Sequence, residues 1–279
     1  MRLRWAALAV AALAGALAFA ISRPGEEALV SPPAAAPARA EVKGVVERSP
    51  AVVPSATAVR RAWRYARRRG GRVSFAVSDS EGRLRGRDAR RRYVSASVVK
   101  AMLLVAELRR LRRDGLPLDP GTAELLRAMI TYSDNDSADA VYARVGDAGL
   151  LDVAGAARMR RFTVAGHWTT SMVTAADLAR LFSRVRRLVP RPHKAAALDM
   201  LRSVVGEQRW GIPRAAGASW TVHFKGGWRA TGLGELVHQA AWLGDGNRRL
   251  AIAILTDGQP SRPYAIHTVR GVADRLLSG

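Results

Sequence analysis

Ser97 and Lys100 stand three residues apart at the start of a helix predicted over 97–113. This spacing puts both side chains on one face of the helix, one turn apart. A serine hydroxyl becomes a nucleophile when an adjacent base takes its proton, and a lysine kept neutral by burial and positive neighbours is such a base. The N-terminus of the helix adds backbone N–H groups that can stabilise an oxyanion. An exposed polar pair at a helix start is the alternative interpretation.

Two further motifs follow along the chain. Ser133-Asp134-Asn135 comes after a helical stretch, and Asn135 is one of only two asparagines in the sequence, so a chance match is rare. Its alternative interpretation is a helix cap or an Asx turn. Lys225-Gly226-Gly227 closes a strand of alternating apolar residues, where the backbone can approach a ligand closely. A plain exit from strand to turn is the alternative there.

Lysine is scarce in a strongly basic chain. Only four of the 45 basic residues are lysines, and the formal net charge is +22. Two of those four, Lys100 and Lys225, fall on the motifs. Since a guanidinium cannot act as a base near neutral pH, these positions are predicted to require ammonium chemistry.

The elements around these motifs predict an α/β (α+β) fold. Ser55 is a candidate cap for a first helix that ends at Gly70-Gly71. The pattern then predicts, in order, strands over 72–78 and 83–87, helices over 97–113, 121–132, 136–145, 174–187 and 193–205, strands over 220–225, 234–243 and 250–256, and a closing helix over 262–277. Strands at both ends of the domain indicate an antiparallel sheet lobe with flanking terminal helices and an inserted all-α lobe. The cleft between such lobes is a common place for a catalytic site.

The three motifs, in this order, resemble the active-site set of the class A β-lactamase-like serine hydrolases, within the superfamily of β-lactamases and penicillin-binding proteins. The resemblance extends from about Ser55 to the C-terminus. It implies that Ser97 is the acylated nucleophile and Lys100 its activating base. It also implies that Ser133 relays a proton to the leaving nitrogen.

The same resemblance assigns the remaining roles. Asn135 would hold the amide of the substrate, and Lys225 would supply positive potential. The oxyanion hole would consist of the backbone N–H groups of Ser97 and Trp228, with Gly227 beside them in the substrate-binding strand. Asp134 is expected to be structural.

Two departures from the family pattern affect the expected activity. Gly226 stands where the family usually has a threonine or serine hydroxyl for the substrate carboxylate. No glutamate occurs between Glu124 and Glu207, although class A enzymes activate the deacylating water with a glutamate in this part of the chain. Asp147 or Asp152 could take its place with a shorter side chain. The sequence therefore predicts an acyl-enzyme that deacylates poorly.

Two more residues are possible members of the site. Glu207 lies in a polar segment that precedes a strand, and the alternative is a structural loop anchored by Trp210. His223 alternates with Lys225 and so shares its face, or it is simply a half-buried strand histidine. The other histidines lack ligand spacing, so no metal and no cofactor are predicted.

The N-terminus predicts export. Residues 1–21 combine Arg2 and Arg4 with an apolar run and a small-x-small Ala18-Phe19-Ala20, as in a signal peptide that is cleaved or kept as a signal anchor. Residues 22–54 form an Ala/Pro-rich linker, and 55–279 form the hydrolase domain. The expected location is extracellular or in the cell envelope. The protein would be attached to the membrane only if residues 1–21 remain uncleaved.

Composition narrows the partners. The chain has no cysteine, which excludes disulfides and thiolate chemistry. We expect a monomer that acts on a small-molecule or peptidoglycan-derived substrate and binds no specific nucleic acid. Two alternatives stay open: a catalytically idle module that binds the cell envelope, and a basic polymer-binding protein whose charge attracts polyanions.

Overall fold

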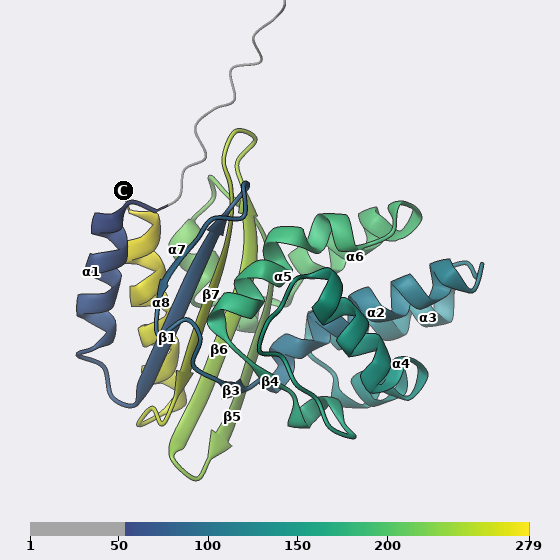
Figure 1. Cartoon of the computed structure of the whole chain (residues 1–279), viewed down its shortest axis with the longest axis horizontal. Coiled ribbons are helices and arrows are strands. Elements are labelled where there is room, and N and C mark those ends of the chain that lie inside the picture. Colours follow the sequence, from purple (N-terminus) through teal and green to yellow (C-terminus); the bar gives the residue numbers. More distant parts are fainter. Residues whose placement is uncertain (1–53, 279) are drawn as a thin grey trace, which may run out of the picture. The chain divides into compact units, whose positions relative to one another are not determined.

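A computed structural model describes residues 54–278 of the chain (Figure 1). Its helices are α1 (Ala56–Ala66), α2 (Lys100–Arg113), α3 (Pro120–Arg127), α4 (Asn135–Ala156), α5 (Ala175–Leu188), α6 (Lys194–Arg202), α7 (Ile212–Ala216) and α8 (Arg262–Leu277). Its strands are β1 (Arg72–Asp79), β2 (Leu84–Arg87), β3 (Tyr93–Val94), β4 (Met172–Val173), β5 (Thr221–Thr231), β6 (Gly234–Gly244) and β7 (Arg249–Asp257). Short 3₁₀ and π-helical turns join several of these elements.

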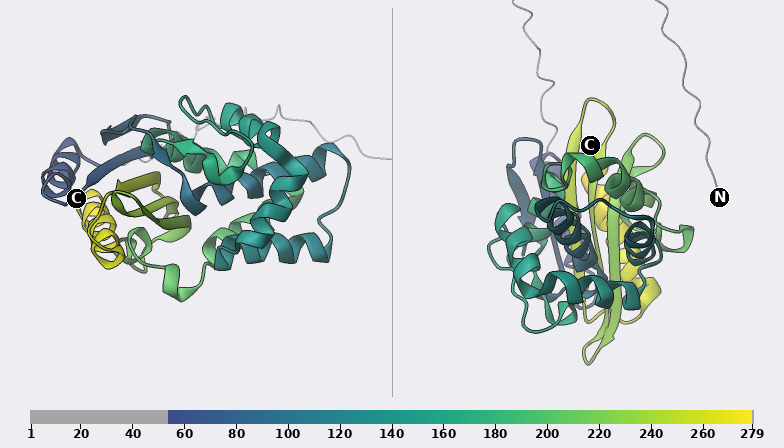
Figure 2. Two further views of the ribbon diagram at one scale, coloured as in Figure 1. Left: turned by 90° about the horizontal axis from the view of Figure 1, so that it is seen from below. Right: turned by 90° about the vertical axis from the view of Figure 1, so that its right-hand side faces the viewer.

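Five strands form one antiparallel sheet in the order β2-β1-β7-β6-β5. Helices α1 and α8 pack together against one face, and α5 covers the other (Figures 1 and 2). Coverage on both sides explains why β7 is buried along nearly its whole length, since its Ile252 and Ile254 point to one face and its alanines to the other. Strand β5 is an edge of this sheet, and that edge is where the motif Lys225-Gly226-Gly227 lies.

The helical lobe is inserted between the N-terminal strands and β5. Helix α2 runs through its centre and is buried from Lys100 to Leu108 on all sides, as expected of a helix whose apolar residues surround it. Helices α4 and α2 pack together, and α6 reaches the edge strand β5. The two-stranded pair of β3 and β4 joins the lobe to the sheet. The motifs therefore sit on rigid elements that meet where the lobe contacts β5.

The predicted fold class is confirmed, with differences in detail. Strand β5 continues through the Lys225-Gly226-Gly227 motif to Thr231, so the prediction that this motif closes the strand is wrong. Pairing with β6 over its full length overrides the local turn signal of two glycines, as in Gly226 opposite Gln239. Helix α4 also extends beyond 145, because the chain bends at Gly146 (φ 57°) and then continues as a helix.

The expected leader (1–21) and almost all of the expected linker (22–54) lie outside the described residues. Among residues 54–278, no helix is both long and apolar enough to cross a membrane.

Candidate active site

Ser97 lies in a 3₁₀ turn, Ala96–Val99, which leads directly into α2. The preceding Ala96 has a φ of 46°, in the left-handed region that non-glycine residues rarely adopt. Such strain persists where surrounding structure imposes it, and it is frequent at active sites. The turn is held next to the paired strands β3 and β4, because the backbone N–H of Ser95 donates to the Ser171 carbonyl at 2.8 Å. The Ser97 hydroxyl is partly exposed, and no residue from 54 to 278 makes a hydrogen bond to it.

Lys100 is fully buried at the first position of α2. Its Nζ donates three hydrogen bonds: to the carbonyls of Ser133 (2.6 Å) and Asp134 (2.9 Å), and to Oδ1 of Asn135 (2.7 Å). Burial lowers the pKa of Lys100 from 10.5 to about 8, while the carboxylates of Asp134 and Asp139 act in the opposite direction. A lysine with this pKa is available as a base near neutral pH.

Ser133 is held between the two motif lysines. Its backbone is left-handed (φ 64°, ψ 33°), which presents its carbonyl to Lys100. Its Oγ accepts a hydrogen bond from Lys225 Nζ at 2.9 Å. Lys225 is also fully buried, and its Nζ donates to the Gly226 carbonyl at 2.9 Å. Burial, and next the charge of Lys100, hold the pKa of Lys225 well below its usual range. Ser133 thus connects two lysines whose protonation states are coupled.

The other two residues of the second motif have different roles: Asp134 caps a helix, and Asn135 binds Lys100. Asp134 caps α4, because its Oδ1 accepts from the backbone N–H of Ser137 at 2.7 Å, and this bonding lowers the pKa of Asp134. Asn135 is the first residue of α4, and its side-chain oxygen is occupied by Lys100. Its NH₂ group is thereby oriented away from the lysine, with the residue exposed to solvent.

Gly227 lets the edge strand β5 approach the nucleophile turn. A Cβ at this position would lie 2.6 Å from the backbone nitrogen of Ser97 and 2.9 Å from that of Val98. Only glycine permits this approach. The next residue, Trp228, packs edge-to-face against Trp210 with ring centroids 6.2 Å apart, and the guanidinium of Arg262 lies 4.2 Å from the centre of its ring.

Gly226 lies beside an aromatic ring. A Cβ at Gly226 would lie 3.4 Å from the Trp210 ring, so this indole fills the space next to the position where the family usually has a hydroxyl. The Trp210 ring and the Trp228 ring form an aromatic wall at this end of the motif.

Glu207 and His223 lie outside the hydrogen-bonded network of the two lysines. Glu207 is exposed in a 3₁₀ turn, and the adjacent Gln208 donates to the Tyr132 carbonyl at 2.9 Å, which supports the residue preceding Ser133. His223 is buried and its ring packs edge-to-face against Trp242 at 5.2 Å. Burial first, and then the charges of nearby arginines, lower the pKa of His223 to about 4.

Three residues that the sequence motifs do not mark form a group next to Lys100. The Lys100 Nζ lies 5.0 Å from the centre of the Trp168 ring. Trp168 Nε1 donates to Oδ1 of Asp139 at 2.6 Å, and His167 Nε2 lies 3.3 Å from the same oxygen. Asp139 is four residues after Asn135 and hence on the same side of α4. This spacing is the one feature of the sequence that could have indicated that Asp139 lies near the site. His167 and Trp168 come from a distant loop with no motif of its own.

The two aspartates considered as substitutes for the missing glutamate have other partners. Asp147 accepts hydrogen bonds from the Tyr142 hydroxyl and from the backbone N–H of Gly166 (2.8 Å), so it anchors the loop after α4. Asp152 is exposed and pairs with Arg109 at 3.1 Å. Within residues 54–278, no group of three or more potential metal ligands occurs.

Comparisons with known proteins show the family of the chain. A family described as the β-lactamase enzyme family matches residues 119–278, more than half of the chain. The matched part includes Ser133 and Lys225, whereas Ser97 and Lys100 precede it. No match is found among curated proteins.

Solved structures show the same fold. The β-lactamase from Sphaerobacter thermophilus DSM 20745 is similar over 80% of this chain and 97% of its own, with a TM-score of 0.70 and 20% identity. An ancestral class A β-lactamase (GNCA) matches over 79% of this chain and 99% of its own, with a TM-score of 0.68 and 19% identity. A β-lactamase from Xanthomonas campestris pv. campestris is similar over 80% of this chain and 97% of its own, with a TM-score of 0.68 and 18% identity. The fold is that of the class A β-lactamases, and the chain belongs to the β-lactamase enzyme family.

Proposed function

We propose that this protein is an exported serine acyl-enzyme that attacks β-lactam-like or peptidoglycan-peptide-like amides through Ser97 and releases the acyl group slowly. The observation that carries the proposal is the chain of contacts from Asn135 through Lys100 and Ser133 to Lys225, next to the Ser97 turn. Two buried lysines with lowered pKa values contact one serine, Lys100 at its carbonyl and Lys225 at its hydroxyl. Perturbed groups that converge in this way are typical of catalytic sites.

Acylation would follow from the chemistry of these groups. Neutral Lys100 accepts the proton of the Ser97 hydroxyl while Oγ bonds to the carbonyl carbon of the substrate. The backbone N–H groups of Ser97 and Trp228 would hold the oxyanion. The C–N bond then breaks, and a proton passes from Lys100 through the Ser133 hydroxyl to the leaving nitrogen. With a pKa of about 8, about one Lys100 in ten is neutral at pH 7, against about one in three thousand for a pKa of 10.5.

Slow release is proposed because the water-activating group is missing. No glutamate occurs between Glu124 and Glu207. Of the two carboxylates that act on Lys100, Asp134 caps α4 and Asp139 already accepts from the Trp168 indole through its Oδ1. Hydrolysis of the Ser97 ester requires a base that takes a proton from water, so a site without a free carboxylate deacylates slowly.

Export is part of the proposal and rests on the sequence of residues 1–21. The two arginines, the apolar run and the Ala18-Phe19-Ala20 site support it. Fractionation of cells that express the full chain would place the protein outside the cytoplasm. Recovery of the folded protein from the cytoplasm alone would contradict it.

Mass spectrometry of the protein after incubation with benzylpenicillin tests the mechanism. We expect one stable covalent adduct per chain, located on the peptide that contains Ser97. Ser97→Ala should abolish the adduct, and Lys100→Ala should slow its formation on the order of a hundredfold or more, because a general base is lost. Ser203→Ala, at the exposed serine that follows α6, is the matched control and should acylate like the wild type.

The other outcomes separate the alternatives. Hydrolysed drug without a lasting adduct would contradict slow deacylation while supporting a β-lactamase. No adduct and no hydrolysis by folded protein would contradict the enzyme and favour the idle envelope-binding module. A polymer-binding protein would show steeply salt-dependent affinity that survives Ser97→Ala.

A further inference from the structure

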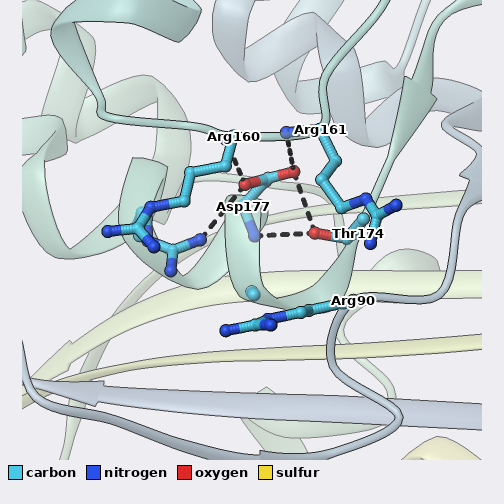
Figure 3. Close-up of a pocket in the computed structure, with 7 residues that line it drawn as sticks. Arg90, Arg160, Arg161, Thr174 and Asp177 are labelled. Atoms are coloured by element: carbon cyan, nitrogen blue, oxygen red, sulfur yellow. Dashed lines mark hydrogen bonds and ion pairs between the residues drawn. The ribbon is translucent and has the colours of Figure 1, made fainter.

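A second candidate site lies away from Ser97, where three distant segments line an open cavity of about 380 Å³ (Figure 3). The segments are the loop between β2 and β3, the loop after α4, and the first turns of α5. The cavity is lined by Arg90, Arg160, Arg161, Thr174, Ala176, Asp177 and Arg180. Its volume is within the range of small-molecule sites. None of its residues belongs to the acyl-enzyme machinery.

The single carboxylate of this cavity is already neutralised. Asp177 is completely buried, and it accepts from the backbone N–H groups of Arg160 (2.7 Å) and Arg161 (3.1 Å). It also accepts from the Thr174 hydroxyl at 2.9 Å and from Arg180 Nη1 at 3.2 Å. Four donors, one of them the Arg180 guanidinium, satisfy this carboxylate. Asp177 therefore fixes the shape of the cavity and has no capacity left for further cations.

The three remaining guanidiniums have no counter-charge. Among residues 54–278, Arg90, Arg160 and Arg161 form no ion pair with a carboxylate. Figure 3 shows the side chains of Arg160 and Arg161 leaving the chain in opposite directions above Asp177, with Arg90 below it. The Arg90 loop is held in place, because the backbone N–H of Ala176 donates to the Ala89 carbonyl at 2.9 Å.

The excess of positive charge extends behind the cavity. Burial, together with the guanidiniums of Arg158, Arg180 and Arg187, lowers the pKa of Arg184, which lies one turn after Arg180 on α5. Like charges this close destabilise one another, and a bound anion would relieve the repulsion.

We propose that this cavity binds a phosphoryl group, with the dianion of a phosphomonoester as the preferred form. Arg90 and Arg160, which have no carboxylate partner among residues 54–278, together carry two positive charges. These match the charge of a phosphomonoester, about −1.5 to −2 at pH 7, better than that of a single carboxylate. The planar guanidinium donates paired hydrogen bonds to phosphate oxygens, which a point charge does not. The cavity also has room for the group that carries the phosphate.

Isothermal titration of the full-length protein with glycerol 3-phosphate at 0.15 M salt tests this proposal. We expect one site per chain, and a loss of affinity of about tenfold in Arg90→Gln and again in Arg160→Gln, because each removes a charge-assisted contact. Glycerate, which carries a carboxylate on the same skeleton, should bind more weakly. Poly(glycerol phosphate), which has only diesters along its chain, distinguishes a free monoester from a polymer as the source.

A charge-matched control uses Arg64→Gln and Arg68→Gln. These exposed arginines line another depression, with Arg61, Tyr65 and Arg275, and their removal takes away the same charge elsewhere. Glycerol 3-phosphate should bind each of these two single variants as tightly as it binds the wild type. Equal losses in both sets of variants, equal affinity for glycerate, or no binding at all would overturn the proposal. Circular dichroism of each variant confirms that it is folded.

Discussion

The two motif lysines differ in what surrounds them, and this difference decides their roles. Lys100 has three oxygen acceptors and two nearby carboxylates, which favour its charged form against burial. Lys225 has two oxygen acceptors, and the charged group that affects its pKa is the ammonium of Lys100. In the proposed mechanism Lys100, with a pKa of about 8, therefore serves as the base, while Lys225 donates to the Ser133 hydroxyl. An arginine could replace neither, because its guanidinium stays charged.

The rate of acylation should follow the titration of Lys100. Because only the neutral amine accepts a proton, the rate should rise about tenfold per pH unit below pH 8 and level off above it. Asp139→Asn removes a negative charge that raises the pKa of Lys100, so the neutral form becomes available at lower pH. The rise should then move to lower pH, with a few-fold faster acylation at pH 6.5. Stopped-flow measurement of penicillin acylation across pH 5.5 to 9.5 provides the profile.

Two features make this variant informative. The amide oxygen of asparagine can still accept from the Trp168 indole, so the local packing is kept. Asp152→Asn is the matched control, because Asp152 is exposed and pairs with Arg109 on the surface. A shift of the Asp139→Asn profile to higher pH, or an equal shift in the control, would show that Lys100 does not set the profile.

At the level of elements, the site depends on how closely the edge strand β5 approaches the 3₁₀ turn Ala96–Val99. Gly227→Ala would place a methyl 2.6 Å from the Ser97 nitrogen, so strand and turn would have to separate by about 1 Å. Displacement of this size costs on the order of a hundredfold in rate when the reacting groups are positioned precisely by their scaffold. We expect a loss of this order in the penicillin acylation rate, measured by stopped flow.

Gly226→Ala is the control for this prediction because it adds the same methyl one residue earlier. There the nearest atoms belong to the Trp210 ring at 3.4 Å and 3.5 Å, which is an ordinary contact. Acylation by this variant should stay within a few-fold of the wild type. If both variants, or neither, lost activity, the close approach of β5 would not be what positions Ser97.

The elements themselves could largely be predicted from the sequence. Periodicity located the long helices and the three C-terminal strands, because each buries a continuous apolar face. The end of β5 was missed, since two glycines signal a turn locally while pairing with β6 keeps the strand extended. The contact of Asp139 with Trp168 could not be predicted either. It joins residues far apart in the chain, and no local pattern records such tertiary contacts.

At the scale of the whole molecule, the net charge of +22 is not one surface property. Part of it is neutralised locally, as where Glu107 is buried and pairs with Arg110 at 2.8 Å and Arg144 at 3.2 Å. Part is uncompensated, as around Asp177. The total attracts polyanions without selecting among them. Selectivity has to come from places where the backbone that carries the arginines is held, and the cavity at the start of α5 is such a place.

The whole domain should lose stability in mild acid because two histidines are buried in their neutral form. Burial lowers the pKa of both His223 and His238 to about 4, against 6.5 for the free side chain. Between these values the unfolded chain binds more protons than the native one, so the free energy of unfolding falls as pH decreases from 6.5 to 4, by up to about 3 kcal/mol per histidine. His238 also joins the five-stranded sheet to β3, since its Nε2 donates to the Val94 carbonyl at 3.0 Å and its Nδ1 accepts from the Thr256 N–H at 3.3 Å.

Urea unfolding at pH 7.5 and at pH 4.5 measures this loss. His223→Phe keeps an aromatic ring against Trp242 but removes one titrating group, so about half of the difference between the two pH values should disappear. His267→Asn is the control, because His267 is exposed on α8, and its pH dependence should equal that of the wild type. A wild-type stability that is the same at both pH values would show that the native protein accepts these protons as readily as the unfolded chain, and that neither histidine is held neutral by its burial.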